Sequence, residues 1–155
     1  MKVVLAGAYG NLGADIFKVL LKEGHEVVAA DMKERDIGVQ GGNYTFKQID
    51  ATKPETMKGM CDGADVVITT VGLTGTSATV TNYDIDLNGN LNILREAQAA
   101  GVKNFTYISV IKADKAPKVP MLHAKYLFEE ELKKSGMNWV IHRPTGYFYD
   151  IVKVF

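Results

Sequence analysis

The sequence predicts a single α/β domain in which helices cover both faces of a parallel sheet, a doubly wound or Rossmann arrangement. Two observations predict it. Short apolar runs with the length of strands alternate with longer segments whose apolar residues recur at helical spacing. A glycine-rich turn joins the first apolar run to the first of these helical segments. At 155 residues the chain is long enough for one such domain with its own core.

In the first half of the chain, each expected element has a local signal. Ile16, Val19 and Leu20 share one helix face, and Gly24 supplies the residue that ends many helices. Pro54 suits the first turn of a later helix, because that turn needs no N–H donor. The elements expected here are a strand at 3–6, a helix at 11–23, a strand at 25–30, a loop at 31–42, a strand at 44–49 and a helix at 54–61.

The second half continues the alternation. The run from Asp65 to Ile68 is almost wholly apolar, as expected for a strand covered on both faces. The later helices carry leucines at helical spacing, and Gly101 and Gly136 follow their ends. Regular alternation of strand and helix predicts a parallel sheet with helices on both faces. For a doubly wound sheet that binds a dinucleotide, we expect the strand order 3-2-1-4-5-6. The elements expected here are a strand at 64–69, a helix at 83–100, a strand at 105–109, a helix at 122–135 and a strand at 139–142.

The glycine-rich turn is the most informative motif. It reads Gly7-Ala8-Tyr9-Gly10-Asn11-Leu12-Gly13. Without a Cβ at Gly7 and Gly10, the backbone can approach a pyrophosphate, and amides at the helix start point at its phosphates. Gly13 would let the helix lie close to the strand. The pattern predicts that residues 1–155 form a dinucleotide-binding domain, with Tyr9, Asn11 and Leu12 as the other contacts of the turn. The alternative is an ordinary tight strand-to-helix turn.

Asp31 stands at the end of the second strand, 18 residues after Gly13. A carboxylate there can accept hydrogen bonds from both adenosine ribose hydroxyls and would repel a 2′-phosphate. Such charged hydrogen bonds are worth about 1.5–3 kcal/mol. Asp31 therefore favours NAD over NADP, although Lys33 and Arg35 could reach a phosphate. The alternative for Asp31 is a carboxylate that stabilises a turn.

Composition excludes several partner classes. Lys plus Arg equals Asp plus Glu at 18 each, which disfavours a broad surface for nucleic acid or anionic membranes. No stretch approaches the roughly 20 apolar residues of a membrane span, and no metal site is predicted. The single cysteine, Cys61, cannot form an internal disulfide and is expected in the core. A cytoplasmic location is the simplest expectation.

With these residues assembled, the chain resembles the short-chain dehydrogenase/reductase superfamily, in particular its atypical and extended branch of NAD-dependent epimerase/dehydratase and NmrA-like proteins. The glycine turn matches the Gly-x-x-Gly-x-x-Gly motif of that branch. The resemblance implies that Asp50 and Ala51, after the third strand, contact the adenine. It also implies that Val71 and Gly72 pass the adenosine and ribose, and that the Arg-Pro segment containing Pro144 lies near the nicotinamide.

The resemblance also implies chemistry through a Tyr-x-x-x-Lys pair, whose phenol transfers a proton while the lysine holds the ribose and lowers the phenol pKa. Lys125 fits the lysine, but the tyrosine position is Met121. Ser109 stands where the catalytic serine region of the family begins. His123 is a candidate replacement acid, and its alternative role is to line the cofactor edge. Tyr126, Tyr147 and Tyr149 are weaker candidates, the last two being preferred as an apolar lid.

Relatives of this branch continue beyond the Arg-Pro segment into a part that completes the substrate pocket. This chain stops at the apolar stretch 151–155, so the substrate part is expected to be absent, and self-association into a homo-oligomer is possible. The first functional hypothesis is an oxidoreductase or epimerase/dehydratase that uses NAD(H) on a small molecule. The second is a non-catalytic dinucleotide sensor, which Met121 favours. A third is a site for another nucleotide, such as a flavin or S-adenosylmethionine.

Overall fold

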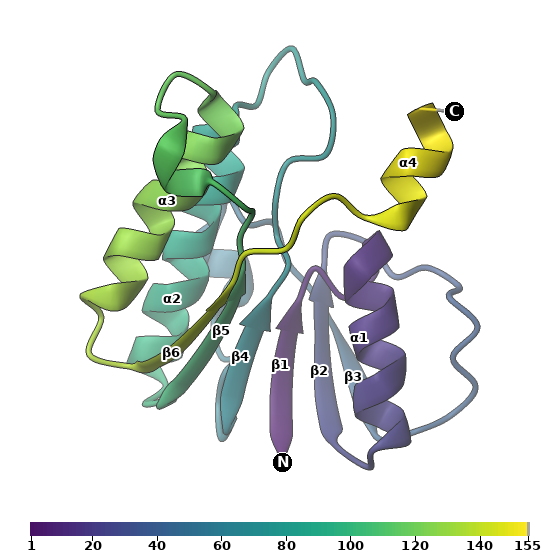
Figure 1. The fold of residues 1–155 in the computed structure, drawn as a ribbon. Coiled ribbons are helices and arrows are strands. Elements are labelled where there is room, and N and C mark those ends of the chain that lie inside the picture. The colour runs from purple at the N-terminus through teal and green to yellow at the C-terminus, as the bar shows by residue number, and fades with distance from the viewer. Residues whose placement is uncertain (155) are drawn as a thin grey trace.

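The computed structural model describes residues 1–154, and Figure 1 shows a single sheet with helices on its two faces. The six strands are all parallel and lie in the order β3-β2-β1-β4-β5-β6. Both the doubly wound class and the predicted strand order are confirmed. The strands are β1 (Lys2–Ala6), β2 (Glu26–Asp31), β3 (Tyr44–Gln48), β4 (Val66–Thr69), β5 (Asn104–Ile108) and β6 (Asn138–His142).

The helices are less regular than the periodicity indicates. The regular ones are α1 (Asn11–Lys22), α2 (Asn90–Ala99), α3 (Pro120–Lys133) and the short α4 (Phe148–Val154), which the sequence did not predict as a helix. Three further turns are the 3₁₀ helices η1 (Pro54–Met57) and η3 (Ala113–Lys115) and the π-helix η2 (Tyr83–Gly89). Phe155, the last residue of the apolar C-terminal stretch, lies outside the described residues.

Two predicted helices are wrong in part. The helix expected at 54–61 is only the single turn η1, because Gly59 adopts a φ of 81°, in the left-handed region that breaks a helix. The helix expected at 83–100 begins as the π-helix η2 before it becomes α2. There the Asn90 side chain donates to the carbonyl of Asp86 at 3.0 Å, a carbonyl that a regular α-helix bonds through the backbone N–H of Asn90.

Two buried clusters lie on opposite faces of the sheet. One packs α2, α3 and η1 against β1, β4 and β5, and the other packs α1 against β1 and β2. Cys61 lies in the first cluster as predicted, and burial raises the pKa of its thiol to about 12. The cysteine is therefore a protonated core residue at neutral pH.

The site is positioned by β1 and β4, the two central strands. The chain leaves β1 for α1 on one face and leaves β4 for η2 and α2 on the other (Figure 1). Doubly wound folds bind ligands at the carboxyl edge of the sheet, where the connections of two neighbouring strands diverge in this way. Among the described residues, no helix is both long enough and apolar enough to cross a membrane.

Candidate dinucleotide site

The packing of the protein requires glycine at positions 7 and 13. Gly7 has a φ of 82°, and a Cβ there would overlap the hydroxyl of Thr70. A Cβ on Gly13 would lie 2.8 Å from the carbonyl carbon of Gly7 and closer still to its oxygen. Any side chain at Gly13 would push α1 away from the end of β1.

Gly10 differs from both. Its φ of −71° and ψ of 173° are open to any residue, and a Cβ would meet only the Gly7 oxygen, at an ordinary 3.5 Å. Gly10 is also the N-cap of α1, and in residues 1–154 no side chain caps this helix and no acid stands in its first turn. The first N–H groups of α1 thus lack side-chain acceptors. A bare backbone in front of them suits an anion.

Asp31 lies against the glycine turn, at the end of β2. Its Oδ2 accepts a hydrogen bond from the Tyr9 N–H at 2.9 Å, and its Oδ1 accepts one from the Met32 N–H at 2.7 Å. A carboxylate oxygen can accept more than one hydrogen bond, so both oxygens keep capacity for a ribose diol. The Tyr9 hydroxyl donates to Glu34 at 3.3 Å, and burial with this carboxylate raises the pKa of Tyr9 to about 12.

The segment after β3 is held rigidly beside the same edge. The Asp50 carboxylate accepts hydrogen bonds from the Thr52 hydroxyl at 2.7 Å and the Thr52 N–H at 3.0 Å, which lower the pKa of Asp50. Asn92 donates to the Ala51 carbonyl at 2.9 Å, which ties this segment to α2. Asp50 is thus an ionised acceptor at neutral pH.

Lys125 reaches the carboxyl edge from α3 and meets a residue that sequence reasoning missed. Its Nζ lies 2.9 Å from Oδ1 of Asp86 on η2, and Asp86 is fully buried. Val71 and Gly72 pass close by at the exit of β4, and a Cβ on Gly72 would lie 2.8 Å from the same carboxylate oxygen. The four-residue spacing of Asn82, Asp86 and Asn90 was the available signal, since it places three polar side chains on one helix face.

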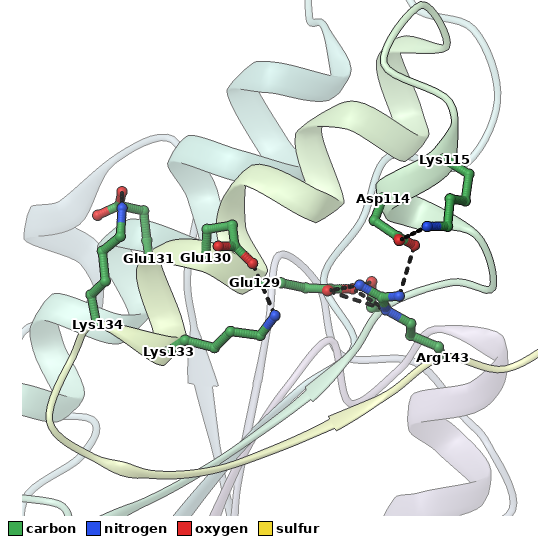
Figure 2. A network of polar contacts seen from close by, with 9 residues as sticks. Asp114, Lys115, Glu129, Glu130, Glu131, Lys133, Lys134 and Arg143 are labelled. Atoms are coloured by element: carbon green, nitrogen blue, oxygen red, sulfur yellow. Dashed lines mark hydrogen bonds and ion pairs between the residues drawn. The ribbon is translucent and has the colours of Figure 1, made fainter.

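Ser109 and Arg143 share Glu129 as a partner, and Figure 2 shows Arg143 between Glu129 and Asp114. The Ser109 hydroxyl donates to Glu129, a fully buried residue of α3 that sequence reasoning also missed. Arg143 Nε donates to both Glu129 oxygens at 3.1 and 3.2 Å, and its Nη1 donates to Asp114 at 2.8 Å. The hydrogen bonds to Glu129 raise the pKa of Arg143. The Arg-Pro segment thus anchors β6 to α3, and Pro144 follows this anchor.

His123 reaches η2. Its Nδ1 lies 3.0 Å from the hydroxyl of Tyr83, and the two rings meet edge to face. Lys125 reaches the same helix, where its Nζ contacts Asp86, so the two side chains have separate partners on η2. Met121 is in the first turn of α3 and partly exposed. No proton-donating side chain therefore stands at the tyrosine position, one turn before Lys125.

The comparisons with known proteins agree with this geometry. A family model described as NAD(P)H-binding matches residues 7–150. The chain belongs to this family. It is 30% identical to the photosystem II assembly factor Ycf39 of Synechocystis, over 98% of this chain and 47% of that protein. It is 28% identical to the uncharacterized sugar epimerase YhfK of Bacillus subtilis, over 94% of this chain and 72% of that protein. The chain thus spans about half the length of the Ycf39 relatives that it matches.

Solved structures confirm the fold. The Bordetella bronchiseptica enzyme WbmH, in complex with NAD⁺, aligns with a TM-score of 0.78 at 20% identity, covering 92% of this chain and 55% of that one. The oxidoreductase ylbE of Lactococcus lactis aligns with a TM-score of 0.77 at 23% identity, covering 93% and 68%. The predicted resemblance is confirmed at the level of the NAD(P)H-binding family. The fold is shared with a short-chain dehydrogenase/reductase superfamily protein of Agrobacterium tumefaciens, with a TM-score of 0.80 at 18% identity.

Proposed function

We propose that this domain binds NAD(H) in preference to NADP(H) and works by binding rather than by tyrosine-dependent proton transfer. The observation that carries the proposal is the uncapped start of α1 behind Gly10, where the protein has no packing reason for a glycine. Asp31, hydrogen-bonded to the same turn, supports the preference for the dinucleotide without a 2′-phosphate.

Different residues at the carboxyl edge of the sheet would bind different parts of the dinucleotide. The α1 amides would hold the pyrophosphate, Asp31 the adenosine ribose, and Asp50 with Ala51 the adenine. Lys125 would hold the second ribose. When bound, the nicotinamide ring supplies a hydride donor or acceptor.

The proton-transfer residues support a binding role. Position 121 is a methionine, the Ser109 hydroxyl is engaged by Glu129, and His123 faces Tyr83. The relatives named as assembly factors support the same conclusion by analogy. In this role, the occupancy or redox state of the nicotinamide regulates association with a partner protein. That requires different affinities for the oxidised and reduced forms.

A second candidate is an oxidoreductase or epimerase/dehydratase acting on a small molecule. The observation that favours it is Lys125, a cation retained at the carboxyl edge where the family places the ribose. Its proton donor would have to be a group other than residue 121. Turnover of NADH with a panel of carbonyls and quinones would support this candidate. The single buried Cys61 supports a reducing compartment such as the cytoplasm for either function.

Asp31→Asn tests the cofactor preference. The amide oxygen still accepts from Tyr9, but the charge that repels a 2′-phosphate is gone. Calorimetric titration with NAD, NADH, NADP and NADPH should show the unaltered chain preferring the NAD pair. In Asp31→Asn that preference should fall by about tenfold or more, the effect of one charged hydrogen bond. Glu23→Ala, which removes an exposed carboxylate at the opposite end of α1 from the turn, should change nothing. Equal affinity for NAD and NADP in the unaltered chain would contradict the preference.

A further inference from the structure

Asp86 is a buried carboxylate to which three segments converge. Its Oδ1 faces the Lys125 ammonium at 2.9 Å. Its Oδ2 accepts from the Leu73 N–H at 3.3 Å and from the Asn82 amide at 3.0 Å. The carboxylate thus ties the loop that leaves β4 and the start of η2 to α3.

Lys125 is held from two sides. Besides the carboxylate, its Nζ lies 5.7 Å from the centroid of the Tyr107 ring. Only 13% of the Lys125 side chain is exposed, and none of the Asp86 side chain is. The carboxylate and the aromatic ring together leave the Lys125 side chain little freedom to move.

We infer that Asp86 is a positioning residue that holds Lys125 so that its ammonium binds neutral ribose hydroxyls rather than a phosphate. This inference rests on the proposed binding of dinucleotides. An ammonium has three N–H donors, so one can face Asp86 while the others remain for the two hydroxyls of the second ribose. Because the pair carries no net charge, it offers little attraction to an anion at the same place.

The consequence is selectivity between ligands that share adenosine and a pyrophosphate. ADP ends where the second ribose would begin, ADP-ribose adds that neutral ribose, and ATP places an anionic phosphate there instead. With Asp86 beside Lys125, the chain should bind ADP-ribose more tightly than ADP and bind ATP no more tightly than ADP. Without Asp86, the ammonium lacks an anionic partner, so the third phosphate of ATP should raise the affinity and the second ribose should not.

Calorimetric titration of the three nucleotides into the unaltered chain and Asp86→Asn tests this. We expect ADP-ribose to bind the unaltered chain about tenfold more tightly than ADP, and ATP to bind no more tightly than ADP. In Asp86→Asn, the advantage of ADP-ribose should disappear and ATP should bind about tenfold more tightly than it binds the unaltered chain. Asp62→Asn, the same substitution at an exposed position, should leave all three affinities unchanged.

Lys125→Gln is a second variant that tests the inference if Asp86→Asn does not fold. It should bind ADP-ribose no more tightly than ADP, and it should bind ATP no more tightly than the unaltered chain does. A preference for ADP-ribose that survives in either variant would overturn the inference while leaving dinucleotide binding intact. No binding of ADP or ADP-ribose to the unaltered chain would overturn the proposed function together with the inference.

Discussion

Replacing Arg143 with alanine is expected to lower the free energy of unfolding by about 3 kcal/mol. The guanidinium is the partner of Glu129, whose side chain is buried between α3 and β6. Without it, the carboxylate must either stay buried without its counter-charge or take up a proton, and both cost stability. Urea unfolding followed by circular dichroism measures the loss.

Figure 2 contains the matched control. Lys133 pairs with Glu130 at 2.9 Å on the same helix, but both side chains are more than a third exposed. Lys133→Ala should therefore change stability by less than about 0.5 kcal/mol, as surface pairs do. The double variant Glu129→Leu with Arg143→Met should recover most of the stability lost in Arg143→Ala. If Arg143→Ala and Lys133→Ala destabilise equally, Arg143 is not the partner on which Glu129 depends.

Gly13→Ala is expected to be more damaging still, with a loss of more than about 3 kcal/mol. The new methyl group would lie against the backbone carbonyl of Gly7, and backbone cannot move aside as a flexible side chain can. Relief requires α1 to shift off the sheet, which opens the cluster formed by Leu5, Phe17 and Val27.

Thermal unfolding compares Gly13→Ala with Gly10→Ala, the same substitution three residues earlier. At Gly10 the methyl group meets no protein atom closer than 3.5 Å. A Gly13→Ala variant as stable as Gly10→Ala would show that α1 does not pack on the turn as described.

The fold could be predicted from the sequence because its signals are local. Apolar periodicity and the glycine-rich turn are each contained in a few consecutive residues, and they indicate the doubly wound class. The usual strand order of dinucleotide-binding members of that class is the one observed. The irregular helix η2 could not be predicted in this way, because its form depends on the Asn90 side chain bonding to the Asp86 carbonyl. A leucine stripe indicates a helix but not whether polar side chains will compete with its backbone hydrogen bonds.

In the candidate site too, residues with local sequence signals could be predicted, and residues that depend on distant partners could not. The glycine turn and Asp31 could be found because each follows directly from a strand, and the structure places them in contact. Asp86 and Glu129 could not, because their partners Lys125 and Arg143 are 39 and 14 residues away. The resemblance placed Ser109 at the start of the catalytic serine region and the Arg-Pro segment near the nicotinamide. The partners Glu129 of Ser109 and Asp114 of Arg143 lie 20 and 29 residues away in the sequence, so short motifs do not report them.

The central claim is that the turn behind Gly10 binds the pyrophosphate of a dinucleotide. The most direct test is calorimetric titration of NAD into the unaltered chain and into Gly10→Ala, with thermal unfolding of both. The account predicts micromolar binding to the unaltered chain, a loss of at least about tenfold in Gly10→Ala, and equal unfolding temperatures, because only the ligand needs the space above Gly10. Equal NAD affinity in both chains, or no binding to either, would contradict the account.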